Sequence, residues 1–416
     1  MAQRPLDPMT EAVRAAARAG VPRRRLLQAA ALGGAAVAAS PLLAACGTKG
    51  TATPSSSGSS DATSSAPTTP DKSDTDKALN FSNWQLYIDV DAKNKNDHPT
   101  LDQFKAKTGV TVAYTEDIND NDSFYAKILP SLKAGQDTGR DLMALTDWMA
   151  ARLVRQGYVQ KVDHANTPNI AANLIDSLKA PTWDPTRDFS APWQSGVTGI
   201  AYNSAKVPEV KTISELLTRP DLKGKVTVLT EWRDTIGLIM LDMGKDPSKF
   251  TADDFNNAVD MLQKANDSGQ IRQFTGNDYS QLLTDGSAYA SIAWSGDVVQ
   301  LQADNNKIKF VEPEAGMMIW ADNMLIPNMA QHKKNAEELM NFYYDPAIAA
   351  QLTAYVQYIC PVKGAKEAMA KVDKTLVDNQ LIFPDDAFLA KTHLFMGLDE
   401  ATEKTYAAAF NKVKGS

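Results

Sequence analysis

Carboxylates and tryptophans occur together at two places in this sequence. Glu231 and Asp234 stand three residues apart around a tryptophan, and Asp322 follows Trp320 at the end of an apolar run. A carboxylate buried without a partner is costly, so we expect an acid in such a run to contact something. Aromatic faces attract cations by about 0.5–2 kcal/mol, so these residues could bind an organic cation. A structural interpretation of the first pair is that Asp234 caps a helix and Glu231 pairs with Arg233.

Motifs of covalent catalysis are missing from the sequence. It has neither a Gly-rich phosphate loop nor the Gly-x-Ser-x-Gly pattern of a nucleophile elbow. The acidic run 117–122 lacks the Gly and Glu that a calcium-binding EF-hand loop needs. The histidines show no close metal spacing; they are His98, His164, His332 and His393. We therefore expect no catalytic residue, no metal and no cofactor.

The N-terminus has the features of a bacterial export signal. Arg23-Arg24-Arg25 precedes a short apolar segment and resembles the twin-arginine motif. The segment ends in Leu43-Ala44-Ala45-Cys46, which resembles the lipobox of bacterial lipoproteins. The sequence thus predicts an export signal over residues 1–45 and a lipid on Cys46, with an ordinary signal peptide and a chance cysteine as the alternative. Acyl chains, at about 0.8 kcal/mol per buried methylene, would tether the exported chain to the outer face of the cytoplasmic membrane.

Residues 46–78 predict a flexible linker. Between residues 48 and 77 the chain contains no large apolar side chain, so it cannot bury enough surface to offset the entropy lost on ordering. Leader and linker leave roughly 340 residues to fold, a length for which two domains are expected.

The whole chain has a net charge of -7, from 43 basic and 50 acidic residues. Removal of the arginine-rich leader makes the mature chain more acidic. This argues against nucleic acid as a partner, because proteins that bind nucleic acid carry basic faces. If Cys46 is acylated, Cys360 has no partner within the chain and is expected to be a buried, inert thiol.

Short apolar strands alternate with amphipathic helices through the mature region. Strand patterns occur near residues 79–81, 110–114, 142–145, 226–229, 289–294, 310–311 and 324–326, and helix patterns lie at 101–104, 124–132, 213–217 and 255–262. Gly109 is placed to end the first of these helices. Such alternation predicts two mainly parallel sheets covered by helices.

Several motifs appear in an order that resembles one known family. They are Phe81-Ser82-Asn83-Trp84-Gln85-Leu86-Tyr87, Thr108-Gly109-Val110-Thr111-Val112, Asp141-Leu142, Gly157-Tyr158-Val159-Gln160-Lys161-Val162-Asp163, Gly199-Ile200-Ala201-Tyr202-Asn203, Leu222-Lys223-Gly224-Lys225-Val226, Ala293-Trp294-Ser295-Gly296-Asp297, and Glu314-Ala315-Gly316 through Ile326-Pro327. From about Leu79 to the C-terminus the chain resembles the spermidine/putrescine-binding proteins of bacterial ABC importers.

The resemblance implies an α/β fold of the type II periplasmic-binding-protein kind, with two lobes and a ligand cleft between them. Lobe 1 would comprise residues 79–197 plus 321–365, and lobe 2 residues 198–320 plus 366–416. The implied ligand is a polyamine, and the implied partners are an ABC permease and its ATPase. We expect a monomer.

The resemblance also implies ligand-contacting residues. They are Trp84, Tyr87, Thr146, Trp148, Glu231, Asp234, Trp294, Trp320, Asp322 and Tyr358. Three departures from the family leave the preferred amine open. Glu231 and Asp234 reverse the family's Asp-x-x-Glu order, Thr146 and Trp148 replace Ser and Tyr, and Met396 stands where relatives commonly have a glutamine.

Other functions are compatible with the same sequence. A receptor of this fold could take another organic cation, an opine or a metal chelate. The chain could also be the ligand-binding subunit of a membrane sensor, or an anchored hydrolase, although a hydrolase would need a nucleophile with a base.

Overall fold

The computed structural model describes residues 67–94 and 96–415. The predicted export signal, Cys46 and the predicted linker as far as residue 66 lie outside the described residues. Within the described part, no helix is both long enough and apolar enough to cross a membrane.

A mixed sheet of ten strands organises the described residues. Its hydrogen-bonded order is β2-β1-β3-β9-β4-β7-β5-β6, with β10 beside β9 and β8 beside β4. The strands are β1 Ala78–Trp84, β2 Thr111–Ile118, β3 Leu142–Thr146, β4 Ser190–Asn203, β5 Val226–Leu229, β6 Ile271–Thr275, β7 Ala290–Trp294, β8 Ile308–Val311, β9 Met317–Leu325 and β10 Thr392–His393.

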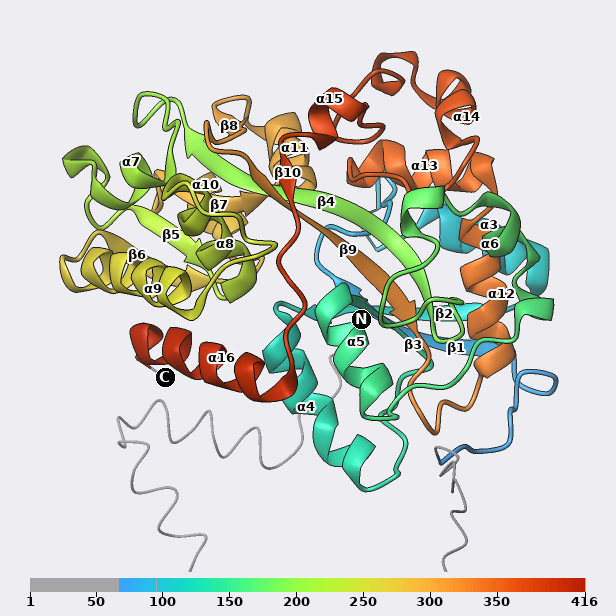
Figure 1. The fold of residues 1–416 in the computed structure, drawn as a ribbon. Helices are drawn as coiled ribbons and strands as arrows, with labels where there is room; N and C mark the ends of the chain where they lie inside the picture. The colour runs from blue at the N-terminus through green and yellow to red at the C-terminus, as the bar shows by residue number, and fades with distance from the viewer. Residues whose placement is uncertain (1–66, 95, 416) are drawn as a thin grey trace, which may run out of the picture. The chain divides into compact units, whose positions relative to one another are not determined.

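Helices cover the sheet and connect its strands (Figure 1). They are α3 Pro99–Thr108, α4 Asn121–Lys133, α5 Asp147–Arg155, α6 Pro168–Asn173, α7 Ile213–Thr218, α8 Trp232–Asp242, α9 Ala252–Asp267, α10 Tyr279–Thr284, α11 Ser295–Asp304, α12 Lys333–Tyr343, α13 Pro346–Val356, α14 Ala365–Val372, α15 Asp386–Leu389 and α16 Glu400–Lys414.

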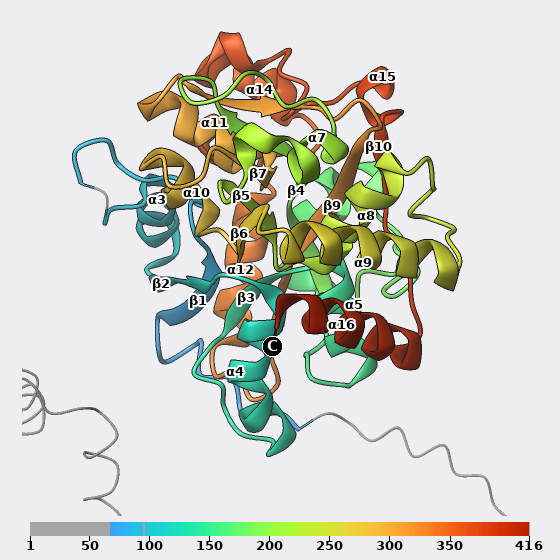
Figure 2. The same ribbon diagram turned by 90° about the vertical axis from the view of Figure 1, so that its left-hand side faces the viewer.

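The sheet has two halves joined by two long strands. In one half β1 pairs in parallel with β2 and β3, and in the other β5 pairs in parallel with β6 and β7. Strands β4 and β9 run antiparallel to each other and reach both halves. Figures 1 and 2 show a layer of helices around each half. The arrangement confirms the predicted two-lobed α/β fold. The two predicted sheets, however, form one continuous mixed sheet, because β9 pairs with β3, β4 pairs with β7, and β4 and β9 pair with each other.

Local signals in the sequence explain where individual helices begin and end. Gly109 ends α3 with a φ of 78°, a left-handed conformation that glycine adopts without strain. The Asp120 side chain accepts a hydrogen bond from the amide of Ser123 and caps α4. Thr251 and Asp254 form a reciprocal capping box at the start of α9.

The end of the predicted linker is ordered in the structure. The Ser73 hydroxyl is buried and accepts a hydrogen bond of 3.1 Å from the Asn335 amide, and the Lys72 amide donates one of 2.8 Å to the Gln331 carbonyl. This part of the predicted 46–78 linker therefore lies against the start of α12 and the loop before it. Its order comes from specific hydrogen bonds, which the polar composition of the segment does not reveal.

The C-terminal residues pack on helices at two places. Met369 and Ile382 form an apolar cluster with Ala350 of α13. Helix α16 instead packs on α9, where the rings of Tyr406 and Phe255 stack with centroids 3.8 Å apart. Both views place α16 beside α9 (Figures 1 and 2). The C-terminal residues thus contact both α13 and α9.

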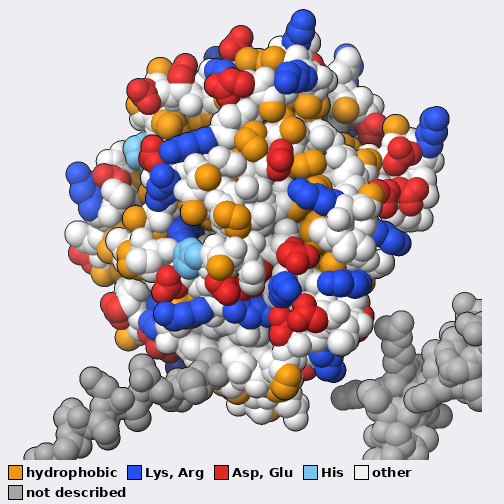
Figure 3. Space-filling model, turned by 90° about the vertical axis from the view of Figure 1, so that its right-hand side faces the viewer, with side chains coloured by type: hydrophobic (Ala, Val, Ile, Leu, Met, Phe, Trp, Pro, Cys, Tyr) orange, Lys and Arg blue, Asp and Glu red, His pale blue; other side chains and the backbone are white. Residues whose placement is uncertain are grey.

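Positive and negative side chains are interspersed on the face shown in Figure 3, and hydrophobic side chains are scattered among them. On this face the charges do not gather into the basic patch that a nucleic-acid-binding surface would need. Cys360 is buried, as predicted, and burial raises the pKa of its thiol to about 11.

Candidate ligand-binding site

All ten predicted ligand residues line one pocket. It has a volume of about 650 Å³ and lies where β1, β3, β5 and β7 end and where β9 crosses the sheet. Ligands of open α/β sheets bind at such carboxyl ends. The ten residues are Trp84, Tyr87, Thr146, Trp148, Glu231, Asp234, Trp294, Trp320, Asp322 and Tyr358.

The end of β1 contributes two aromatic side chains. Trp84 is fixed by a hydrogen bond of 3.0 Å from its indole nitrogen to the carbonyl of Ala144. Leu86 has a φ of 59°, which is rare for a residue other than glycine, so the chain turns sharply before Tyr87. The Tyr87 hydroxyl is buried and lies near the carboxylate of Asp322, whose pKa it lowers against the larger effect of burial.

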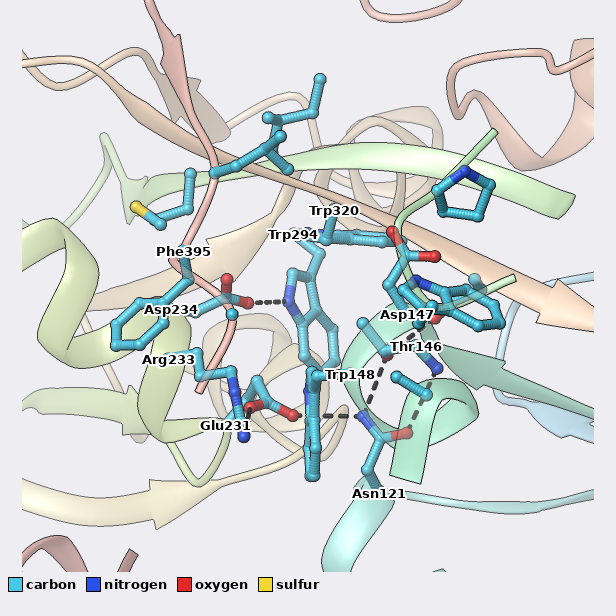
Figure 4. A pocket seen from close by; sticks show the side chains of 18 of the residues that line it. Asn121, Thr146, Asp147, Trp148, Glu231, Arg233, Asp234, Trp294, Trp320 and Phe395 are labelled. Carbon is cyan, nitrogen blue, oxygen red and sulfur yellow. Dashed lines mark hydrogen bonds and ion pairs between the residues drawn. The ribbon is translucent and has the colours of Figure 1, made fainter. Parts of the chain in front are cut away.

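Asp322 lies on β9 next to the end of β3. It is paired with Thr146 in the antiparallel register, and the Thr146 hydroxyl donates a hydrogen bond of 2.7 Å to its carboxylate. The amide nitrogen of Asn121, at the start of α4, donates to Thr146 at 2.9 Å and to Glu231 at 3.1 Å (Figure 4). A chain of hydrogen bonds therefore connects the two acidic segments identified in the sequence.

The turn from β5 into α8 carries Glu231, Arg233 and Asp234. Glu231 occupies the N-cap position of α8 but its side chain makes no capping hydrogen bond, and Asp234 lies inside the first turn. The carboxylate of Asp234 instead accepts a hydrogen bond of 2.9 Å from the indole of Trp294. Glu231 and Arg233 form an ion pair at 3.8 Å. Helix capping by Asp234 is therefore wrong, whereas the predicted pairing of Glu231 with Arg233 is confirmed.

The turn from β7 into α11 carries Trp294 and, three residues later, Asp297. Asp297 is 1% exposed and accepts hydrogen bonds of 2.7 Å from the Tyr358 hydroxyl and 2.8 Å from the Tyr279 hydroxyl. The side-chain amide of Asn277 donates a third, also of 2.8 Å. These contacts place a second aspartate at the aromatic part of the pocket.

Two glycines allow the aromatic rings to approach the backbone. A Cβ added to Gly296 would lie 2.4 Å from the ring of Tyr358, and one added to Gly196 would lie 2.6 Å from the ring of Trp320. Real Cβ atoms do not tolerate such distances, so both positions require glycine.

Aromatic rings form a connected wall. Ring centroids are 5.8 Å apart for Trp84 and Trp294, 6.3 Å for Trp294 and Trp320, and 5.5 Å for Trp320 and Tyr358. Tyr87 meets Tyr358 edge-on at 5.0 Å. We call these five side chains the aromatic wall. Such a wall offers flat apolar surface to methylene groups and ring faces to cations.

The carboxyl groups of the pocket have raised pKa values. Burial raises the pKa of Asp322 to about 7, of Asp234 and Asp297 to about 6, and of Glu231 to about 8. Among the described residues, no Lys or Arg forms an ion pair with Asp234, Asp297 or Asp322. The guanidinium of Arg233 is near enough to lower the pKa of Asp234 slightly, against the larger effect of burial. A bound cation would supply the missing charge and favour ionisation.

The pocket also contains residues that the sequence interpretation missed. Asp297 belongs to a quoted motif, so its position after Trp294 was a usable signal. Asp147 follows Thr146, and burial raises the pKa of its carboxyl group to about 6. Phe395 and Glu403 come from the C-terminal segment, and no local pattern links them to the pocket. Met396, which stands where relatives commonly have a glutamine, also lines the pocket.

Comparison with known proteins places this geometry in context. Residues 100–379 match the family model described as "Bacterial extracellular solute-binding protein". The spermidine/putrescine-binding periplasmic protein of Escherichia coli K12 is 25% identical over 313 residues, which cover 75% of this chain and 84% of that protein. The putrescine-binding periplasmic protein PotF of the same organism is 27% identical over 359 residues, covering 81% of this chain and 91% of that protein.

A solved structure shares the fold. The putative spermidine/putrescine ABC transporter from Listeria monocytogenes superimposes with a TM-score of 0.69 and 23% sequence identity. The match covers 81% of this chain and 99% of the Listeria chain.

Proposed function

The chain belongs to the family of bacterial extracellular solute-binding proteins, and we propose that it captures a polyamine and delivers it to the permease and ATPase of an ABC importer. The relatives named for spermidine and putrescine support the ligand class. The observation that carries the proposal is the group of three buried aspartates beside the aromatic wall, with no ion-pair partner among the described residues.

A polyamine is complementary to these features. Its ammonium groups would meet Asp322, Asp234 and Asp297, and its methylenes would lie along the aromatic wall. Charge-assisted hydrogen bonds to carboxylates are about twice as strong as neutral ones. Thr146 would orient Asp322 through its hydrogen bond of 2.7 Å. Trp148 and Glu231 would contact the ligand at the other end of the pocket.

Titration calorimetry with putrescine, spermidine and spermine tests the proposal on the exported chain. We expect saturable binding of at least one amine and none of a neutral diol of similar length. Failure of all three amines to bind would refute a polyamine ligand. The thioether of Met396 and the reversed order of Glu231 and Asp234 favour a receptor for a different organic cation as the second candidate. The same panel extended to other cations identifies it.

We propose further that the protein binds its ligand without changing it. The family is one of solute-binding proteins rather than enzymes. A bound amine should be recovered intact from the complex, and time-dependent conversion by the purified protein would contradict this.

Several predicted features of organisation remain part of the proposal. They are export, a lipid on Cys46 at the outer face of the membrane, a monomeric state, and lobes of residues 79–197 plus 321–365 and 198–320 plus 366–416.

A further inference from the structure

Glu403 carries a carboxylate that two arginines share. It lies on α16 at the edge of the pocket, and its side chain is 8% exposed. One of its oxygens, Oε1, accepts hydrogen bonds of 2.7 Å from both Arg152 and Arg233. The other oxygen lies 3.5 Å from a guanidinium nitrogen of Arg155. Positive charges that would repel one another are therefore held together by a single negative charge.

The two arginines belong to different halves of the sheet. Arg152 is on α5, which follows β3, and Arg233 is on α8, which follows β5. Both views show α16 next to α4 and α5 (Figures 1 and 2). The ring of Trp148, also on α5, lies with its centroid 3.8 Å from the guanidinium carbon of Arg233, and Figure 4 shows these two side chains together. Glu403 and Arg233 thus connect the two halves at this end of the pocket.

Neighbouring carboxyl groups do not replace Glu403 in this role. Asp122 pairs with Arg152 at 3.0 Å, but it is on α4 of the same half and its side chain is 50% exposed. Glu231 lies 3.8 Å from Arg233, yet burial raises its pKa to about 8, so it is mostly protonated near neutral pH. Burial acts in the same way on Glu403, but the charges of Arg233 and Arg152 outweigh it and lower the pKa of Glu403. Glu403 is therefore ionised under conditions in which Glu231 is not.

Glu403 also separates the pocket from an outer groove. This groove has a volume of about 380 Å³ and lies between α16 on one side and α4 and α5 on the other. Arg155 and Glu403 line both the pocket and the groove, whereas Arg152 lines the groove. The ion pairs of Glu403 therefore close the pocket toward the groove.

A ligand held by the aspartates of the pocket can leave only when the halves separate. Asp234, Asp297 and Asp322 are at most 6% exposed, so a group bound to them is enclosed. Two lobes joined by a few strands open and close by hinge motion, and β4 and β9 join the halves here. Helix α16 packs on α9, so Glu403 stays with Arg233 while Arg152 moves away. Opening therefore breaks the contact between Arg152 and Glu403.

We propose that Glu403 is a positioning residue that keeps the pocket closed around its ligand. Its hydrogen bond to Arg152 exists in the closed form and is lost in the open form. Glu403 therefore slows the release of a bound ligand and leaves its capture unchanged, because capture begins from the open form. This inference rests on the proposed function, because it takes a polyamine as the ligand.

Stopped-flow tryptophan fluorescence with putrescine and spermidine tests the inference on the exported chain. Truncating one partner of a buried charge pair acts on the dissociation rate, so Glu403→Gln should release the amine about tenfold faster or more, with an association rate within about threefold of the wild type. Glu400→Gln is the matched control. Glu400 lies one turn earlier on α16, is exposed, and lines the groove but not the pocket. An unchanged release rate in Glu403→Gln, or an association rate that falls as much as release rises, would overturn the inference.

Arg152→Gln and the double variant with Glu403→Gln test the contact itself. Substitutions of residues in contact are not additive. Arg152→Gln should therefore speed release too, and the double variant should release the amine no faster than Glu403→Gln alone. Additive effects would show that the two residues act separately and would overturn the inference. Thermal melts establish that each variant folds, and the release rate of Arg152→Gln decides the matter if Glu403→Gln does not fold.

If neither amine binds the wild type, the proposed function fails and the ligand-free proteins decide the inference. Small-angle X-ray scattering should then give a larger radius of gyration for Glu403→Gln than for Glu400→Gln, because the closed form has lost its contact. Equal radii would overturn the inference.

Discussion

The hydroxyl of Thr146 donates a hydrogen bond of 2.7 Å to the carboxylate of Asp322, although 176 positions separate the two residues in the chain. They face each other because β3 and β9 pair in antiparallel register at this point. Asp322 thus lies on β9, one of the two strands that join the halves of the sheet. Its carboxylate is held by Thr146, the last residue of β3, which belongs to one half. We therefore expect Asp322 to be a sensitive position for ligand binding.

Replacing Asp322 by Asn should weaken polyamine binding strongly. The change keeps the shape of the side chain but removes the negative charge of a buried residue, since Asp322 is only 3% exposed. Truncating one partner of a buried charge pair costs about 2–5 kcal/mol, or roughly thirty-fold to several thousand-fold in Kd. Calorimetry measures the change. Asp378→Asn, at a site that is 93% exposed, is the control, and its affinity should match the wild type. Unchanged affinity in Asp322→Asn would remove this residue from the site.

The affinity for a polyamine should rise with pH between 5 and 8. Burial raises the pKa of Asp322 to about 7 and of Asp234 to about 6, so that these groups must lose protons before they can meet an ammonium ion. Each group that has to ionise changes Kd by roughly tenfold per pH unit below its pKa. Titrations in buffers of different ionisation enthalpy should also detect proton release on binding. A Kd that stays constant over this range would contradict the proposed contacts.

The ligand-free protein should be more stable at pH 6 than at pH 8. The pKa of Asp322 is about 7 in the folded state, above the ordinary value, so between the two values the folded state binds more protons than the unfolded state. Stability therefore falls as pH rises through this window. Glu231, with a pKa of about 8, and His332, whose pKa is also raised, act in the same direction.

Thermal melts at the two pH values measure this difference, at about 2–4 °C per kcal/mol for a domain of 150–250 residues. Asp322→Asn, which keeps His332, should reduce the difference. An equally large difference in the variant would assign it to other groups.

Gly296→Ala should disrupt binding without removing any charged group. The new Cβ would lie 2.4 Å from the ring of Tyr358, and that ring is buried. Overpacking of this kind typically costs about 1–3 kcal/mol. Tyr358 would have to move away from Asp297, whose carboxylate it contacts at 2.7 Å. Gly397→Ala, which adds a methyl group at another pocket-lining glycine but with no atom within 4 Å of the new Cβ, is the control for the melting temperature. Wild-type affinity and melting temperature in Gly296→Ala would show that the ring can move freely.

Cys46→Ala should release the mature protein from membranes. Residues 43–46 resemble a lipobox, and without acylation nothing in the prediction holds the chain to the bilayer. Fractionation of cells that express the variant, followed by a high-salt wash, measures the effect. A variant that stays wholly with the membrane would show that anchoring does not depend on Cys46.

The sequence was sufficient to predict ten of the residues that line the pocket, because most of these ten follow short apolar strands. Carboxyl ends of parallel strands meet at one edge of a sheet, so residues such as Thr146 and Glu231 could be assigned to one site from strand patterns and family motifs. The long strand β4 was harder to recognise. All of its positions are buried, and a strand with both faces buried shows no alternation of polar and apolar residues.

The sequence by itself determined the two-lobed α/β fold and the acidic, aromatic character of the site, because apolar periodicity and motif order are local properties of the chain. Only the tertiary structure decided how the charges are shared. Arg233 contacts Glu403 at 2.7 Å across 170 positions of sequence, because α16 packs on α9 and brings Glu403 to the start of α8. Ion pairs and burial depend on distances through space, so the sequence could not show which carboxylates of the pocket pair with a basic side chain and which do not among the described residues.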